Sequence, residues 1–182
     1  MRATTVLLVR RDGVAVMASD GQVTLGDTVI KRGAGKVKRI GKGEVMVGFA
    51  GSAADGLALV TRFEAKLDES QGNLERAVVE LAKDWRTDRV LRQLEAMMLI
   101  AGPDRTFLMS GNGDLLQPDR TDGSEAIAIG SGSNYALAAA RALLRHTDLA
   151  PREVVEEAMR LAAEICVYTN DHFTIEELVD KS

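Results

Sequence analysis

The dipeptide Asp12-Gly13 constrains the fold more than any other feature of this 182-residue chain, because it separates two apolar segments, Thr5–Val9 and Val14–Ala18. A two-residue hairpin turn requires positive φ at both central residues, and Asp-Gly adopts that conformation readily. The segments are therefore predicted to pair as an antiparallel hairpin in which facing residue numbers sum to about 25. This register places Thr5 beside Asp20 at the open end of the hairpin.

Thr4 begins the first strand of this hairpin, and removal of Met1-Arg2-Ala3 would make it the N-terminal residue. A threonine in that position carries a hydroxyl nucleophile and a free α-amine that can serve as its base. β-branched residues also favour strands for packing reasons alone, so a purely structural threonine remains open at this point. Serine, cysteine and metal-dependent hydrolase mechanisms are disfavoured, because the chain has two histidines, one cysteine and no G-x-S-x-G or H-E-x-x-H motif.

Composition favours a single domain without a nucleic-acid or membrane surface. A chain of 182 residues that is 46% hydrophobic can bury a self-sufficient core, and no linker divides it. The formal charge of −4 comes from interspersed acidic and basic residues, and no apolar stretch approaches the roughly 20 residues that cross a bilayer. The lone Cys166 cannot form an internal disulfide, which suits a reducing compartment and predicts a cytoplasmic protein.

The remaining pattern predicts strands and helices in blocks. A second hairpin is expected from strands at 36–40 and 44–49, with residue 40 facing residue 44 and Lys36 facing Gly48. A first helix is expected to start within residues 50–55 and to end at Leu67, with Leu57 on its apolar stripe. Further helices are expected over 73–85, 135–145 and 151–168. Strands are expected over 96–101, 106–110 and 126–129, and the segment 174–179 is expected to be either a strand or a short helix. Such blocks, without βαβ alternation, predict an α+β fold with antiparallel sheets, which a four-layer αββα sandwich accommodates.

Five segments together resemble the HslV family: Ala18–Gly26, Lys83–Arg89, Ser110–Asp114, Ala128–Gly132 and Ile165–Asn170. HslV is the peptidase subunit of the bacterial HslUV ATP-dependent protease and is related to the proteasome β-subunit. The resemblance runs from Thr4 to the C-terminus. It implies an N-terminal-nucleophile hydrolase with the αββα sandwich fold, a threonine endopeptidase whose residues 4–182 form a single peptidase domain.

The resemblance also implies the catalytic residues. Thr4 matches the nucleophile, whose hydroxyl would attack the scissile carbonyl while the free α-amine takes and returns the proton. Lys36 matches the active-site lysine, and an ammonium beside the hydroxyl lowers the pKa of both the hydroxyl and the amine. Asp20 matches the acid that pairs with this lysine and fixes it.

Two further residues complete the implied catalytic set. Ser131 matches a serine that hydrogen-bonds around the terminal amine; on the sequence pattern alone it is a turn residue. An oxyanion requires preorganised N–H donors, and Gly51 at the start of a helix is expected to supply one, with Gly48 as the alternative.

No cofactor is expected for the chemistry, but family members bind a monovalent cation, usually sodium, through backbone carbonyls after the last long helix. The matching positions are Ala163, Cys166 and Thr169. Ala163 replaces the expected glycine, which a carbonyl ligand tolerates. Without the resemblance, Cys166 is predicted to be a buried thiol that behaves as a small hydrophobic residue.

The resemblance implies a homo-oligomer of two stacked hexameric rings, docked by HslU, a hexameric AAA+ ATPase that unfolds and threads protein substrates. The chain has no G-x-x-x-x-G-K-[ST] motif, so ATP is expected to act only through that partner. Two alternatives are a non-catalytic ring-forming subunit, disfavoured by the presence of Thr4, Asp20 and Lys36, and an N-terminal-nucleophile amidase acting on small amides.

Met1-Arg2-Ala3 departs from the family, in which a lone methionine more often precedes the threonine. Residues 1–3 are therefore predicted to be a short propeptide, removed when the Thr4 hydroxyl attacks its own preceding carbonyl, or the result of a mis-assigned start. The uncleaved chain should be inactive, because its base is held in a peptide bond.

Intact mass tests this prediction. The purified wild-type chain should lose the mass of Met1-Arg2-Ala3, whereas Thr4→Ala, which lacks the attacking hydroxyl, should retain it. Retention of all three residues by an assembled wild-type ring would contradict self-processing, and expression from a methionine placed directly before Thr4 would then test the mis-assigned start.

Overall fold

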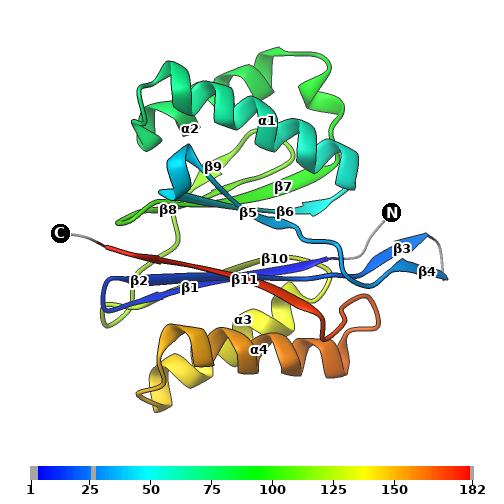
Figure 1. The fold of residues 1–182 in the computed structure, drawn as a ribbon, viewed down its shortest axis with the longest axis vertical. Coiled ribbons are helices and arrows are strands. Elements are labelled where there is room, and N and C mark those ends of the chain that lie inside the picture. Colours follow the sequence, from blue (N-terminus) through cyan, green and yellow to red (C-terminus); the bar gives the residue numbers. More distant parts are fainter. Residues whose placement is uncertain (1–3, 26–27, 181–182) are drawn as a thin grey trace.

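The structure, a computed structural model, describes residues 4–25 and 28–180 and has four layers. Two antiparallel sheets lie face to face, and a pair of helices covers the outer face of each (Figure 1). The α+β sandwich predicted from the sequence is confirmed. Residues 1–3, predicted to be a propeptide or a mis-assigned start, lie outside the described residues.

The first sheet is built around the predicted hairpin. Its strand order is β10-β1-β2-β11, with β10 at Glu125–Gly130, β1 at Thr5–Arg11, β2 at Val14–Asp20 and β11 at Phe173–Val179. Val6 faces Ser19, and Asp12 and Gly13 have φ of 51° and 75°, so the register and the turn are as predicted. The segment 174–179, for which the sequence pattern allowed either a strand or a short helix, forms most of the edge strand β11.

The second sheet has the strand order β5-β6-β7-β8-β9, and a separate pair, β3 and β4, projects beyond the body of the molecule (Figure 1). These strands are β5 Val37–Ile40, β6 Val45–Gly51, β7 Ala96–Ala101, β8 Thr106–Met109, β9 Leu115–Leu116, β3 Val23–Leu25 and β4 Thr28–Lys31. All pairings of the larger sheet are antiparallel.

The predicted register of the second hairpin is wrong by one residue. Ile40 faces Val45, so Gly48 faces Val37 and not Lys36. The turn is longer than expected because a short 3-10 turn at Gly41–Gly43 is followed by one more residue in helical conformation before β6 begins. Since a slip of one residue moves a side chain to the other face of a sheet, the correction matters for Lys36. This residue lies just before β5, and its carbonyl accepts the N–H of Phe49 at 3.2 Å.

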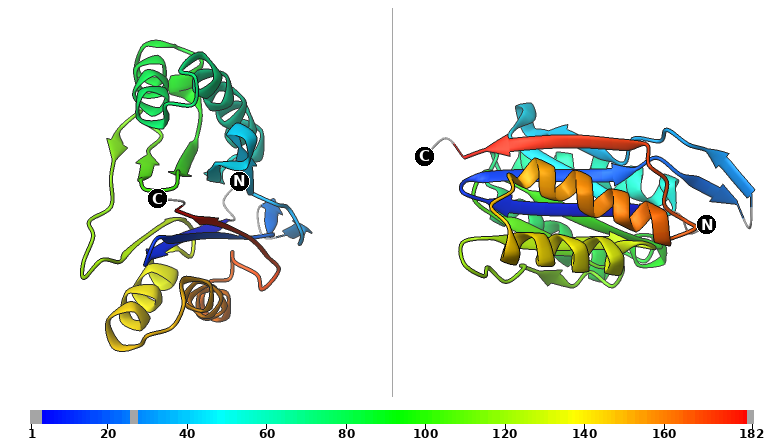
Figure 2. Two further views of the ribbon diagram at one scale, coloured as in Figure 1. Left: turned by 60° about the vertical axis from the view of Figure 1, so that its left-hand side comes forward. Right: turned by 90° about the horizontal axis from the view of Figure 1, so that it is seen from below.

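Helices α1 (Ala53–Glu69) and α2 (Leu74–Thr87) cover the five-stranded sheet, and α3 (Ser133–His146) and α4 (Pro151–Ile165) cover the four-stranded one. Figure 2 shows α4 lying over β1 and β2, while α3 packs beside it against β10 and β1. Ser52 and Asn73 cap α1 and α2 with their side-chain oxygens. Helix α4 ends three residues before the predicted limit, since Cys166 is already extended. None of the helices in the described part of the chain is long and apolar enough to cross a membrane.

The prediction that Leu57 belongs to the apolar stripe of α1 is wrong. Leu57 is 43% exposed, whereas Gly56 and Leu59 face the sheet. Gly56 lies against the ring of Phe49, and a Cβ at that position would be 2.0 Å from it. The close approach of α1 to β6 therefore requires glycine and rotates Leu57 toward solvent.

Strand β1 is buried on both faces. Val6 and Leu8 point into the core between the two sheets, whereas Leu7 and Val9 point into the core under α3 and α4. A third core lies between the five-stranded sheet and α1 and α2. Alternation with a period of two thus makes one short strand contribute to two cores.

A buried ion pair lies within the first sheet, at the end opposite Thr4. Arg10 on β1 contacts Glu125 on β10 at 3.1 Å, and each side chain is less than 5% exposed. Arg10 also donates to the carbonyl of Gly102 at 2.8 Å, in the turn between β7 and β8. The guanidinium therefore links the first sheet to a turn of the second.

Glu125→Ala should destabilise the fold by about 3–5 kcal/mol, because it leaves the buried charge of Arg10 without its partner. Glu75→Ala, which removes one side of the exposed pair with Arg105, should cost at most about 1 kcal/mol. Thermal unfolding at a fixed protein concentration compares the two variants. Equal shifts in melting temperature would contradict the structural role of the buried pair.

Candidate active site

Thr4, Asp20 and Lys36 lie together at the open end of the first hairpin. Thr4 directly precedes β1, Asp20 is the last residue of β2, and Lys36 directly precedes β5. Their exposed fractions are 1%, 0% and 3%. Two strands of one sheet and one of the other therefore deliver a hydroxyl, a carboxylate and an ammonium to a single buried position.

The Lys36 ammonium contacts the Thr4 side chain directly. Its Nζ donates a hydrogen bond to the Thr4 hydroxyl, and a second one to the carbonyl of Gln22 at 2.7 Å. A positive charge at a hydroxyl oxygen favours the deprotonated form and so lowers the hydroxyl pKa. The Thr4 hydroxyl is therefore the hydroxyl of this cluster that lies directly against a positive charge.

Backbone N–H groups hold the Asp20 carboxylate. It accepts from Thr5 at 2.7 Å, from Gln22 at 3.1 Å and from Asn170 at 3.3 Å. Burial raises the pKa of Asp20 above its ordinary value, while the Thr5 N–H and the charge of Lys36 act in the opposite direction. The donors and the lysine therefore offset part of the cost of burying this carboxylate.

Burial shifts the pKa of Lys36 in the opposite direction. Removal from water lowers the pKa of the Lys36 ammonium, and the negative charge of Asp20 raises it again in part. The two groups are thus electrostatically linked, each favouring the charged form of the other.

Ser131 contacts Thr4, and Gly51 lies at the end of a strand of the other sheet. Ser131 follows β10, and its backbone N–H donates to the Thr4 carbonyl at 2.8 Å, while its side chain is exposed. Gly51 ends β6 with φ of 115°, and a Cβ there would lie 2.2 Å from the Glu95 carbonyl, so only glycine fits. A Cβ on Gly130, at the end of β10, would touch both the Thr4 carbonyl and the side chain of Ala50 on β6. The ends of β10 and β6 therefore meet beside Thr4.

Sequence reasoning missed the role of Thr5. Its hydroxyl accepts the N–H of Gly132 at 2.8 Å and makes a 2.7 Å hydrogen bond with the hydroxyl of Thr169. These contacts fix the residue after Thr4 to the end of β10 and to the loop after α4. The Thr5-Asp20 register was the one available signal that Thr5 lies at the site.

Ala163, Cys166 and Thr169 lie at the C-terminal end of α4 and in the loop that follows. The Cys166 carbonyl accepts the N–H of Thr169 at 3.0 Å, so a turn joins these two positions. Carbonyl oxygens of a last helical turn lack amide partners within the helix and carry its negative dipole end. Among the described residues no group of three or more His, Cys, Asp or Glu side chains could hold a metal ion.

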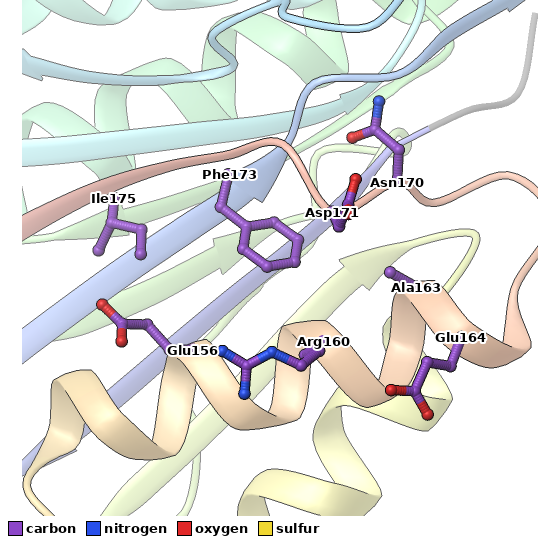
Figure 3. Close-up of a pocket in the computed structure, with 8 residues that line it drawn as sticks. All are labelled: Glu156, Arg160, Ala163, Glu164, Asn170, Asp171, Phe173 and Ile175. Atoms are coloured by element: carbon purple, nitrogen blue, oxygen red, sulfur yellow. The ribbon is translucent and has the colours of Figure 1, made fainter.

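A surface pocket of about 720 Å³ lies between α4 and β11, and Figure 3 shows the residues that line it. Ala163 and Asn170 line it on the side nearest the active site, and Phe173 and Ile175 line it from β11. Asn170 is 8% exposed and its backbone N–H donates to the Asp20 carboxylate, so this residue lies between the pocket and Asp20.

The architecture and the buried site at the start of β1 define the class of this protein. The family model described as "Proteasome subunit" matches residues 1–178. The chain belongs to the proteasome subunit family, whose members have this sandwich.

Within that family the chain groups with HslV. The ATP-dependent protease subunit HslV of Pseudothermotoga lettingae is 59% identical over 177 residues, which are 97% of this chain and 98% of the relative. HslV of Aquifex aeolicus is 57% identical over 178 residues, 98% and 99% of the two chains. The resemblance proposed from sequence motifs is confirmed.

Solved structures agree with this grouping. The crystal structure of eukaryotic HslV from Trypanosoma brucei superposes with a TM-score of 0.89 at 43% identity, covering 96% of this chain and 99% of that one. Thiobacillus denitrificans BPH in complex with epoxomicin has a TM-score of 0.78 at 26% identity, covering 98% of this chain and 100% of that one.

Asp20→Asn should lower the pKa of Lys36 further. The substitution removes the negative charge that raises this pKa while the burial that lowers it remains. The pH titration of isotope-labelled Lys36, followed by NMR, measures the shift. Exposed Glu80→Gln should leave the Lys36 titration unchanged, and an upward shift in Asp20→Asn would contradict the electrostatic link.

Proposed function

We propose that this chain is the proteolytic subunit of a two-component ATP-dependent protease and cleaves peptide bonds with Thr4 as nucleophile. The observation that carries the proposal is the hydrogen bond from the Lys36 ammonium to the buried Thr4 hydroxyl, at the first strand of a proteasome-type sandwich. The name of the HslV relatives, ATP-dependent protease subunit, supports the same function.

In the proposed reaction, loss of residues 1–3 frees the α-amine of Thr4. This amine takes the hydroxyl proton as the Thr4 oxygen bonds to the scissile carbonyl carbon. The protonated amine then gives the proton to the leaving nitrogen as the peptide bond breaks, which leaves an ester on Thr4. Water, deprotonated by the amine, attacks this ester, and the acid product leaves as the hydroxyl regains its proton.

The neighbouring residues have distinct roles in this reaction. Lys36 stabilises the developing charge on the Thr4 oxygen and keeps the amine pKa low enough for it to act as a base near neutral pH. Asp20 keeps Lys36 charged despite burial. Ser131 holds the Thr4 carbonyl and acts beside the freed amine, and the Gly51 N–H donates to the oxyanion.

We further propose that a sodium ion binds the carbonyl oxygens of Ala163, Cys166 and Thr169. The residues fit the ion, because these carbonyls follow one another where α4 ends and hard monovalent cations prefer oxygen ligands. When bound, the ion would offset the negative end of the α4 helix dipole. The Thr169 hydroxyl contacts Thr5, so the same residue faces both the ion site and the catalytic strand.

We propose the same assembly as the sequence resemblance implies: two stacked hexameric rings in the cytoplasm, served by the hexameric AAA+ ATPase HslU, which delivers unfolded proteins. Docking of the ATPase is expected to activate the Thr4 site allosterically. The naming of the relatives as protease subunits supports an oligomer with an ATPase partner. The buried, free Cys166 is compatible with a reducing compartment.

Thr4→Ala should abolish peptide and casein hydrolysis while ring assembly, measured by sedimentation, stays intact, because the variant loses only the nucleophile. Thr4→Ser, which keeps a hydroxyl on the same atom, should retain measurable hydrolysis. Peptide cleavage by Thr4→Ala at the wild-type rate would refute the mechanism.

The partner is tested in the same assay. Wild-type turnover should be low alone and rise when the ATPase and ATP are added, and Lys36→Ala should be nearly as damaging as Thr4→Ala in both conditions. Equal turnover with and without the ATPase would contradict activation by docking. Cleavage of small amides but not of casein, with the ATPase present, would favour the amidase alternative.

A further inference from the structure

Two segments that carry catalytic groups cross each other backbone to backbone beside the active site. Gly21 follows Asp20, and Arg32 precedes Lys36 by four residues. A Cβ on Gly21 would lie 2.2 Å from the Arg32 carbonyl oxygen, and the Gly21 carbonyl accepts the N–H of Ala34 at 3.0 Å. Because the backbones touch, the position of this crossing determines how Lys36 lies relative to Asp20.

The side-chain amide of Asn170 bridges the crossing. Its Oδ1 accepts the Gly21 N–H at 3.1 Å, and its Nδ2 donates to the Arg32 carbonyl at 2.9 Å. Oδ1 also accepts the N–H of His172 at 3.2 Å, which anchors the amide to its own loop. One planar group therefore joins the segment that leaves β2 to the segment that leads to Lys36.

Asparagine has the required chemistry for this position. The bridge needs an acceptor for one segment and a donor for the other on the same short side chain, which only a carboxamide provides at this length. The residue is 8% exposed, so its hydrogen bonds form in a medium of low dielectric constant. Its backbone N–H also donates to the Asp20 carboxylate at 3.3 Å.

We propose that Asn170 is a positioning residue for catalysis: its amide fixes the Gly21-Arg32 crossing and thereby holds the Lys36 ammonium against the Thr4 hydroxyl. The inference rests on the proposed function, since it requires hydrolysis through Thr4. Asn170 acts through other residues and does not contact the reacting atoms. Its loss is therefore expected to lower kcat with little change in KM.

The test compares Asn170→Ala and Asn170→Asp with wild type in steady-state peptide hydrolysis, with the ATPase present and after assembly has been checked. Asn170→Ala should lower kcat about tenfold or more while KM changes less than about twofold. Asn170→Asp keeps the acceptors for Gly21 and His172 but turns the donor to Arg32 into a carboxylate oxygen that repels the Arg32 carbonyl, so its kcat should also fall. His172→Ala is the matched control from the same loop, because its N–H remains, and it should keep the wild-type kcat.

Two outcomes would overturn the inference: a kcat of Asn170→Ala within about twofold of wild type, or a loss seen only as a higher KM. If Asn170→Ala does not assemble, Asn170→Asp carries the test, and an unchanged kcat in that variant would overturn the inference. Failure of the proposed function looks different, since wild type would then be inactive or as active as Thr4→Ala.

Discussion

The burial of Lys36 beside Asp20 is the interaction on which the rest of the site depends. An ammonium and a carboxylate removed from water each favour their neutral forms, so the protein must supply compensating partners. It does so with backbone N–H groups on Asp20, a backbone carbonyl on Lys36 and the attraction between the two charges. These partners come from β1, from the end of β2 and from the loop after α4. The charge of Lys36 therefore persists only where distant parts of the chain are already correctly packed.

The sequence predicted the first hairpin well because its turn has one dominant solution. Asp12-Gly13 adopts the positive φ values that a two-residue turn needs, and this fixes the register that brings Asp20 beside Thr5. The second hairpin was misjudged because a loop with two glycines admits several lengths, and apolar residues on both sides of the strand provide no alternation that could choose among them. Local turn chemistry thus decided where prediction succeeded and where it failed.

The contacts of the site were predictable only in part. Motifs that resemble HslV indicated Thr4, Asp20 and Lys36, and the structure places these three together. The hydrogen bonds of Thr5 to Thr169, and of Asn170 to both crossing segments, join residues more than a hundred positions apart, and neither periodicity nor composition encodes such pairs. The roles in catalysis and ion binding stay predictions, because they depend on chemistry rather than on position.

The pairing of β1 with β10 has a consequence for how the enzyme is made. β1 is among the first segments to leave the ribosome, yet one of its neighbours in the sheet is synthesised more than a hundred residues later, and the loop that carries Thr169 and Asn170 follows later still. Long-range pairings of this kind form late, because the intervening chain must first be closed into a loop. A partly synthesised chain therefore holds Thr4, Asp20 and Lys36 without the later residues that fix their positions. The buried site can therefore form only after the loop that carries Thr169 and Asn170 has been made.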